Sequence, residues 1–234
     1  MIKERKRLRE FDLDGVVPWG RRLEEYRAFF ALDDLAPGAS VLDAGGGPAS
    51  FAAEASALGY DVTAADPVYA LDGATIRRRF EETRDAMMSG VRLARYRFRW
   101  KRYGSPEALE KMRRDALDLF LADFGRFGGA RYVPASLPYL PFANDAFDLA
   151  LSSHFLFLYG DDLDCGFHVA AMRELARVAR EVRVFPLVNL DGRPSSHLPL
   201  VTAALEEEGY AAELVPVPFE FQVGATRMLR VRRA

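Results

Sequence analysis

A glycine-rich turn between a buried strand and a helix constrains the fold of this chain more than any other feature. Residues 39–44 are short and apolar, and three glycines, Gly45–Gly47, follow them directly. A helical pattern over 50–58 comes next, and a second apolar strand over 60–65 ends at Asp66. Strand, glycine turn, helix and strand make a βαβ unit, and such units build parallel sheets covered by helices. The turn therefore predicts an α/β domain.

The alternation of strands and helices resumes after residue 130 and continues to the C-terminus. Apolar runs predict the strands, and apolar residues recurring on one face predict the helices. The further strands are predicted at 131–135, 147–152, 181–187, 213–218 and 226–232, and the further helices at 166–180 and 198–208. These elements extend the predicted sheet to seven strands. A chain of 234 residues is long enough to bury one core of that size.

Two segments stand outside this alternation. Residues 71–130 contain two predicted helices, near 72–88 and 106–124, where connections in α/β proteins are normally a few residues long. We expect them to form a helical insertion packed beside the sheet. Residues 1–36 contain apolar side chains at helical spacing behind Pro18, and we expect an N-terminal helical lid. The whole chain, 1–234, is then a single domain with two elaborations.

The composition argues against several classes of protein. The formal net charge of −2 disfavours wholesale binding to nucleic acid or to a membrane surface. Cys165 is the single cysteine, which leaves no intrachain disulfide and no cysteine metal cluster. No run approaches the roughly 18 apolar residues of a membrane span. Residues 1–10 are charged and lack the apolar core of a signal peptide. We expect a cytoplasmic protein without a metal site.

The glycine turn also limits the chemistry of the ligand. Glycines let the backbone approach a ligand closely, but a dinucleotide fingerprint needs a third spaced glycine where Ser50 stands. This departure weakens a nicotinamide oxidoreductase as a candidate. A carboxylate at Asp43 would repel a pyrophosphate, yet it suits the ammonium end of an amino acid. Asp66, at the end of the second strand, can accept both hydroxyl groups of an adenosine ribose.

Two further motifs complete a recognisable set. Residues 136–142 read Ser-Leu-Pro-Tyr-Leu-Pro-Phe, and Phe147-Asp148 leads into the next strand. With the acid-x-Gly-x-Gly turn and the acid that ends the second strand, they resemble the class I S-adenosylmethionine-dependent methyltransferases over about 39–69 and 131–187. The resemblance implies a Rossmann-like fold, a seven-stranded mainly parallel sheet with a reversed last strand, and S-adenosylmethionine as the cofactor.

The resemblance assigns cofactor contacts by position. The three glycines would face the methionine part of the cofactor, Asp43 would support its ammonium group, and Asp66 would bind the ribose. Ser136 stands where the family usually has an acid, and its hydroxyl with the Leu137 N–H would meet the adenine edge. Ser153 ends the fourth strand, where the family places residues beside the transferred methyl. The predicted cofactor-binding residues are Asp43, Gly45, Gly46, Gly47, Asp66, Pro67, Ser136, Leu137, Ser153 and Trp19.

His154 is the candidate general base, because it ends the fourth strand and its reference pKa is near neutral. A base helps only when the acceptor arrives protonated, and a structural hydrogen-bonding role is the alternative. Trp19, together with Arg21, is expected either to cover the cofactor or to fix the N-terminal helix by apolar packing. Residues 219–222, Phe-Glu-Phe-Gln, either line the acceptor side or form a half-buried strand edge.

The methyl acceptor stays open at this stage. A small molecule is favoured, because the insertion has the size to complete a pocket. An RNA methyltransferase is the first alternative, since residues 77–102 carry ten Lys and Arg against three acids, interleaved with aromatic side chains. A non-catalytic protein that binds the cofactor or a partner is the second alternative.

Overall fold

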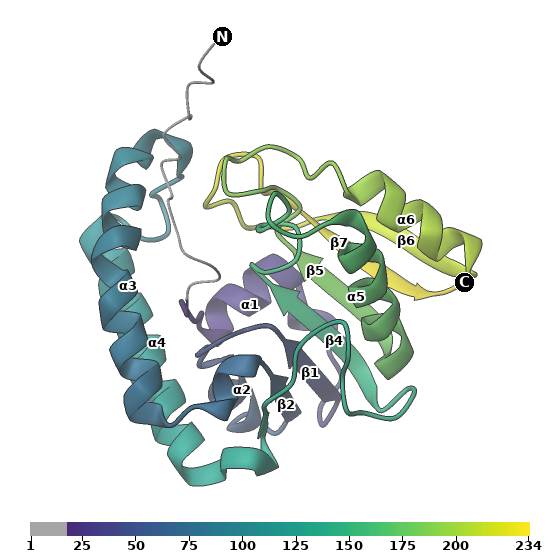
Figure 1. The fold of residues 1–234 in the computed structure, drawn as a ribbon, viewed down its shortest axis with the longest axis horizontal. Helices are drawn as coiled ribbons and strands as arrows, with labels where there is room; N and C mark the ends of the chain where they lie inside the picture. Colours follow the sequence, from purple (N-terminus) through teal and green to yellow (C-terminus); the bar gives the residue numbers. More distant parts are fainter. Residues whose placement is uncertain (1–17) are drawn as a thin grey trace, which may run out of the picture.

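The computed structural model describes residues 18–234, and its centre is a seven-stranded sheet in the order β3-β2-β1-β4-β5-β7-β6 (Figure 1). Neighbouring strands are parallel, except that β7 is antiparallel to both β5 and β6. The strands are β1 (Ser40–Ala44), β2 (Asp61–Ala65), β3 (Tyr132–Val133), β4 (Phe147–Ser153), β5 (Ala179–Phe185), β6 (Tyr210–Pro216) and β7 (Arg227–Arg233). The predicted α/β fold, with its mainly parallel sheet and reversed last strand, is confirmed.

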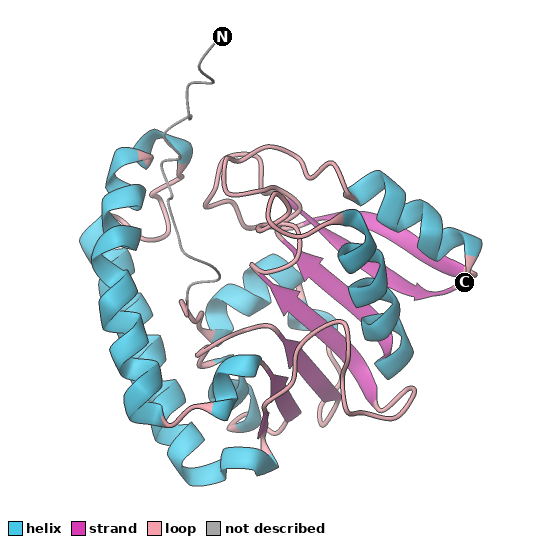
Figure 2. Cartoon of the chain, in the orientation of Figure 1, coloured by secondary structure: helices cyan, strands magenta, loops and turns pink. Residues whose placement is uncertain are grey.

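Helices cover both faces of the sheet (Figure 2). They are α1 (Leu23–Phe30), α2 (Phe51–Ser56), α3 (Gly73–Leu93), α4 (Pro106–Phe127), α5 (Cys165–Val178) and α6 (Leu198–Glu207). Each face has its own apolar cluster, and consecutive residues of one strand enter opposite clusters, as Val41 and Leu42 of β1 do. This alternation follows from the two-residue repeat of a strand, and it explains why a strand buried on both faces reads as a continuous apolar run.

The insertion between β2 and β3 consists mainly of α3 and α4, which lie side by side along one flank of the sheet (Figure 1). Asp72 caps α3 by accepting a hydrogen bond from the Thr75 N–H at 2.6 Å. Ser105 caps α4, and Pro106 occupies its first turn, where a missing N–H costs nothing. Phe80 and Phe120 are fully buried. The insertion therefore belongs to the same core as the sheet.

Strand β3 is shorter than the sequence pattern predicts. The apolar run suggests a strand over 131–135, whereas the ladder with β2 covers only Tyr132 and Val133. Pro134 follows directly, and it has no N–H to donate to the ladder. The early end of β3 leaves residues 135–140 free to turn across the carboxyl end of the sheet, where they line a cavity described below.

The described part of the N-terminal segment is anchored to the glycine turn. The predicted lid spans residues 1–36, and its first 17 residues lie outside the described residues. Helix α1 packs Tyr26, Phe29 and Phe30 completely into the core. Before it, Gly20 passes so close to the turn that a Cβ there would lie 2.0 Å from the Pro48 carbonyl oxygen. Within residues 18–234, no helix combines the length and the apolar character that crossing a membrane requires.

Candidate active site

The glycine turn and Asp66 meet at the carboxyl ends of β1 and β2. The Gly47 N–H donates to Asp66 Oδ2 at 2.9 Å, and the Val68 N–H donates to Oδ1 at 2.8 Å. Tyr69 Oη donates to the Gly47 carbonyl at 2.7 Å, so both backbone polar groups of Gly47 are fixed. The order in which strands are added to the sheet reverses between β1 and β4. Ligands of open α/β sheets bind at such a point.

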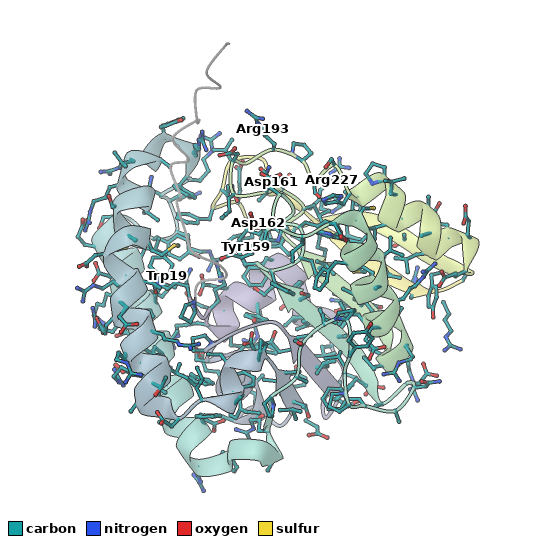
Figure 3. All side chains as sticks on the ribbon, viewed as in Figure 1. Trp19, Tyr159, Asp161, Asp162, Arg193 and Arg227 are labelled. Carbon is teal, nitrogen blue, oxygen red and sulfur yellow. The ribbon has the colours of Figure 1, made fainter. Side chains whose placement is uncertain are left out.

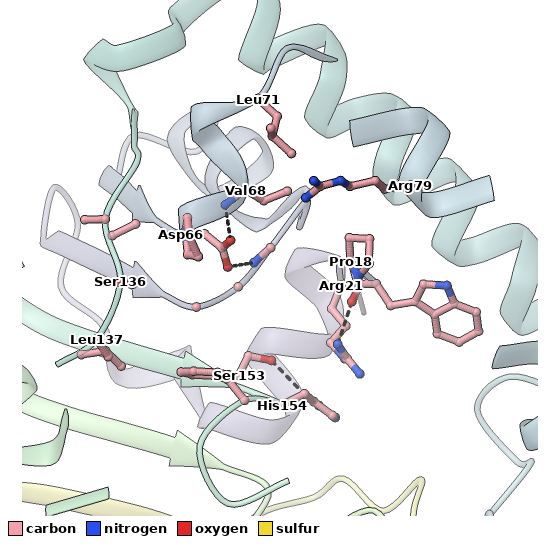
Figure 4. A pocket seen from close by; sticks show the side chains of 18 of the residues that line it. Pro18, Arg21, Asp66, Val68, Leu71, Arg79, Ser136, Leu137, Ser153 and His154 are labelled. Carbon is pink, nitrogen blue, oxygen red and sulfur yellow. Dashed lines mark hydrogen bonds between the residues drawn. The ribbon is translucent and has the colours of Figure 1, made fainter. Parts of the chain in front are cut away.

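A cavity of about 450 Å³ opens at this point (Figure 4). Every predicted cofactor-binding residue except Asp43 lines it, and so does His154. Figure 4 shows Asp66, Ser136 and Leu137 on one side of the cavity, with Arg21 and His154 on the other. The cavity also receives side chains from α3 that sequence reasoning missed, namely Arg79, Glu82 and Thr83. Their positions depend on the packing of the insertion, which no local motif encodes.

The Asp66 carboxylate keeps capacity for a ligand. Each of its oxygens accepts one backbone N–H, and a carboxylate oxygen has lone pairs for a second bond. Burial raises the pKa of Asp66, while the hydrogen bonds from Val68 and Gly47 act against that shift. The two remaining lone-pair directions can accept two hydroxyl groups, which is the chemistry a ribose diol requires.

Asp43 lies beneath the turn instead of in the cavity wall. Its carboxylate is 1% exposed and accepts Tyr26 Oη at 3.0 and 3.1 Å. Gly46 covers it so closely that a Cβ at this position would lie 2.3 Å from Asp43 Oδ2. Burial raises the pKa of Asp43 to about 7, helped by the nearby charge of Asp66, although the Tyr26 hydrogen bond opposes the shift. Asp43 therefore supports the turn from below.

His154 lies at the end of β4 with an unusual backbone. Its φ of 53° is in the left-handed region, and its N–H donates to the Phe185 carbonyl at 2.6 Å. The ring nitrogen Nδ1 is 2.9 Å from Ser153 Oγ (Figure 4), and the ring contacts those of Phe29 and Phe185. Burial, followed by the charges of Arg21 and Arg113, holds the pKa of His154 well below its usual value. The imidazole is therefore neutral at pH 7 and is a weak base.

A second cavity of about 80 Å³ adjoins the first. Trp19, Arg21 and His154 line both cavities and so form the junction between them. Trp19 is 6% exposed, and its indole N–H has no hydrogen-bond partner within residues 18–234. The indole thus packs into the core and also lines both cavities, so its position is compatible with either of the two predicted roles.

Aromatic side chains from distant segments enclose the second cavity. Phe98 and Phe221 stack at 4.6 Å, and their segments are joined by the Arg99 N–H, which donates to the Phe221 carbonyl at 2.6 Å. Phe185 and Phe219 meet edge to face at 5.6 Å. Phe219, Phe221 and Gln222 all line this cavity. The structure thus places the 219–222 segment on the side of the junction away from the glycine turn.

A buried ion pair beneath the junction was not predicted. Arg113 of α4 donates to both oxygens of Glu25 of α1 at 2.6 Å, and Tyr103 Oη also donates to Glu25. Glu25 is fully buried and Arg113 is 3% exposed. Burial opposes ionisation of Glu25, but Arg113 and the hydrogen bonds bring its pKa to about 2. A sequence signal existed, because Glu25 stands four residues before Phe29 and so borders the apolar face of α1.

Further polar side chains follow β4 along the chain, and none of them lines either of the two cavities. Figure 3 shows Tyr159, Asp161 and Asp162 in the loop beyond the end of β4. His168 Nε2 is 3.1 Å from the Leu156 carbonyl oxygen, and His197 Nε2 is 2.8 Å from that of Gly160. These two histidines fix the loop that follows β4, and neither lines the two cavities.

Many arginines of the basic segment 77–102 have acidic partners. Arg77 pairs with Asp118 at 2.7 Å, and Arg92 pairs with Glu107 at 3.3 Å. Arg84 contacts Glu81 and Asp85 of its own helix. Acids of α4 and of α3 itself therefore offset much of the local positive charge that the sequence shows.

The strand order with a reversed β7, and the turn that meets a carboxylate at the ends of β1 and β2, define the Rossmann-like fold of the class I S-adenosylmethionine-dependent methyltransferases. Among solved structures, the chain is similar to a SAM-dependent methyltransferase from Aquifex aeolicus (14% identity, 89% of this chain and 90% of that chain, TM-score 0.44). It is also similar to magnesium protoporphyrin IX methyltransferase from Synechocystis PCC 6803 with bound SAH (14% identity, 91% and 81%, TM-score 0.48).

The chain belongs to the same family as a protein of Methanocaldococcus jannaschii described as "Uncharacterized protein MJ0045". The two are 30% identical over 227 residues, which is 97% of this chain and 100% of that protein. No protein-family model matches the chain.

Proposed function

We propose that this protein transfers the methyl group of S-adenosylmethionine to a small-molecule acceptor. The observation that carries the proposal is the convergence of the Gly47 N–H and the Asp66 carboxylate, 2.9 Å apart, on the wall of one cavity of about 450 Å³. A cavity of this volume matches the usual size of a cofactor site. An adenosyl amino acid needs acceptors for its ribose hydroxyl groups, a backbone that its methionine part can approach, and apolar surface. One wall of this cavity provides the carboxylate lone pairs, the glycines and the apolar surface.

The residues of the first cavity suit the parts of the cofactor in order. Asp66 would accept the ribose hydroxyl groups, and Ser136 with Leu137 would contact the adenine. The glycine turn would hold the methionine part, with Asp43 beneath it as a second source of negative charge. When bound, S-adenosylmethionine would supply a methyl group on a sulfonium sulfur, and the carbon of that methyl group would be open to in-line attack by the acceptor.

The chain itself contributes orientation and exclusion of water. Positioning supplies most of the rate in such a displacement, since the reacting atoms must be held in line and in contact. Trp19, Arg21 and His154 lie at the junction of the two cavities. An acceptor in the second cavity would therefore face the cofactor in the first. Because His154 is neutral and half-buried, its ring can accept a hydrogen bond at this junction without adding charge.

Calorimetry with S-adenosylhomocysteine tests the proposal, with NAD as the competing ligand. We expect binding of the former and none of the latter. Asp66→Ala is expected to weaken binding by about 1–3 kcal/mol, because the hydroxyl groups of the ribose lose their acceptor.

Asp72→Ala is the matched control for Asp66→Ala. Asp72 also accepts a backbone N–H at a helix start, but it lies outside both cavities. Its removal is expected to leave the affinity for S-adenosylhomocysteine unchanged. Tight binding of NAD with no response to S-adenosylhomocysteine would refute the proposed function, and equal affinities in wild type and Asp66→Ala would refute the ribose contact.

A further inference from the structure

Arg21 is a cation at the junction of the two cavities, and it forms no ion pair with any residue that the structure describes. Its only side-chain hydrogen bond within residues 18–234 goes from Nη1 to the Trp19 carbonyl at 2.7 Å, and no carboxylate of that part of the chain lies within ion-pair distance. Its neighbour Arg113 is neutralised by Glu25, and each Glu25 oxygen also accepts a second hydrogen bond, from the Tyr103 hydroxyl or the Arg22 N–H, so neither oxygen is left for Arg21. Arg21 is half-buried, and a charge withdrawn from water is costly unless it is paired, which makes Arg21 a receptor for an anion.

Arg21 keeps its charge in this position. Burial and the nearby Arg113 lower the pKa of Arg21 to about 10, which still leaves it protonated near neutral pH. His154 is neutral there, and the Tyr103 hydroxyl keeps its proton and donates a hydrogen bond to Glu25, so neither adds a negative charge near Arg21. The junction therefore has a net positive charge.

The second cavity is small and is lined mainly by aromatic and apolar side chains. Its volume of about 80 Å³ is several times that of a single water site, which is roughly 10–15 Å³ by the same measure. Phe185 and Phe219 form one edge-to-face pair in its wall, and Tyr103 contacts Phe221 in a second such pair at 4.5 Å. Rings stack well against such walls. The remaining lining is mainly apolar: Met87, Val91, Leu109, Leu158, Leu190 and Ala225.

We propose that the second cavity binds a small aromatic oxyanion, either an aryl carboxylate or a phenolate, with its ring among Phe185, Phe219 and Phe221 and its charged oxygen on Arg21. This substrate class rests on the proposed function, because the oxyanion on Arg21 would lie at the junction where the methyl group arrives. The anion itself is then the nucleophile, and the product is a methyl ester or a methyl ether.

The reaction balances without a base. A lone pair of the oxyanion forms the new oxygen–carbon bond, the carbon–sulfur bond breaks, and its electron pair stays on sulfur to give S-adenosylhomocysteine. One negative and one positive charge disappear, and no proton is released. Arg21 keeps the acceptor ionised before the step, so a weakly basic His154 is compatible with the chemistry. A water-excluded site also favours a step in which opposite charges are neutralised.

The binding experiment uses the wild-type protein saturated with S-adenosylhomocysteine and four single-ring probes. Benzoate and 4-nitrophenolate carry the oxyanion, whereas benzamide and nitrobenzene are neutral rings of similar size. We expect each anion to bind at least about tenfold more tightly than its neutral counterpart, since a charge-assisted hydrogen bond is worth roughly 1.5–3 kcal/mol. Comparing the two anions decides between a carboxylate and a phenolate acceptor.

Arg21→Met is expected to abolish this discrimination and to leave the affinity for nitrobenzene within about twofold. Arg95→Met is the charge-matched control, because Arg95 is exposed on the insertion and lines neither cavity. The absorbance of 4-nitrophenol adds a readout that requires no variant. The bound probe should ionise at a lower pH than the free probe, so the wild type alone decides the question if Arg21→Met does not fold.

Three results would overturn the inference. One is equal binding of anionic and neutral rings, and another is an unshifted titration of bound 4-nitrophenol. The third is an Arg21→Met variant that loses affinity for S-adenosylhomocysteine but not for 5′-methylthioadenosine, since Arg21 would then hold the carboxylate of the cofactor. If the aromatic anions fail while S-adenosylhomocysteine binds in an Asp66-dependent way, the inference fails and the proposed function stands. If S-adenosylhomocysteine itself does not bind, the proposed function fails first.

Discussion

Asp43 has a buried carboxyl group whose only side-chain hydrogen-bond partner within residues 18–234 is the Tyr26 hydroxyl. Its pKa rises from 3.8 to about 7 on folding. The folded state therefore binds a proton that the unfolded chain has lost in this range. The stabilisation from this proton is fully present below about pH 4 and disappears as the pH rises through 7.

Asp43→Asn should remove this pH dependence, because the amide mimics the protonated acid and still accepts Tyr26 Oη. Relative to the variant, the wild-type free energy of unfolding should fall by up to about 1.4 kcal/mol per pH unit between roughly pH 4 and 7. Urea unfolding of the apo proteins across this range measures the difference. Asp66, whose pKa is also raised, is present in both proteins, and its charge is part of what raises the pKa of Asp43 in the wild type. Parallel stability curves would show that Asp43 is ionised throughout.

At the level of single residues, the sequence predicts groups held by local spacing and misses groups held by tertiary contacts. Asp66 could be placed at the cavity because a strand end and a glycine turn fix its position. Arg21 could be named only as a companion of Trp19. Its missing counter-charge depends on Arg113, 92 residues further along the chain, having already engaged Glu25. No local pattern contains that information.

Helices α1 and α4 are joined by the Arg113–Glu25 ion pair, and this link determines how the insertion lies against the junction. Arg113→Met should destabilise the protein by about 3–5 kcal/mol, because it leaves the Glu25 carboxylate buried without a partner. The double variant Glu25→Met with Arg113→Met should recover at least about half of that loss, since no charge is then buried. Chemical denaturation of the single and double variants measures both effects.

Arg92→Met provides the comparison for Arg113→Met. Arg92 of α3 pairs with Glu107 of α4, so this pair also joins α4 to another helix, but both of its side chains are at least half exposed. Its loss should cost less than about 1 kcal/mol. Equal costs for the two arginine variants would mean that Arg113 contributes no more than a surface charge.

The sequence predicts most of the helices and strands, but several of them begin or end at other residues than predicted, for physical reasons. The apolar pattern over 72–88 identifies α3, but the helix continues to Leu93 through Gly90, a poor helix former. Gly90 is buried, so packing outweighs its low propensity. The bridge between Phe98 and Gln222 joins segments more than a hundred residues apart, and it could not be predicted from either segment alone.

The surface charge of the whole molecule is more even than the sequence of the insertion suggests. Arginines within 77–102 pair with acids of α4 and, in the case of Arg97, with Asp191 at 3.1 Å. A basic segment whose arginines are paired with acids attracts the phosphates of a nucleic acid only weakly. This argument favours the small-molecule acceptor over the RNA alternative.

RNA binding is therefore expected to be weak and only mildly dependent on salt. With a single-stranded oligonucleotide, the slope of log K against log salt should be shallower than about −2, which corresponds to fewer than about three phosphate contacts. Neutralising Arg95, Arg97 and Arg99 together should change the affinity little. Fluorescence anisotropy at several salt concentrations gives the slope. A steep slope that disappears in the triple variant would restore RNA as the acceptor.

The contact between the insertion and the β6–β7 connection has a consequence for redesigning the protein. Phe98 comes from the insertion and Phe221 from the β6–β7 connection, and the two rings are stacked on each other in the wall of the second cavity. Selectivity for a new compound is thus encoded in two stretches of the gene that must change together. Grafting the insertion alone from a relative would leave half of a mismatched aromatic pair, whereas exchanging both stretches would transfer an intact wall.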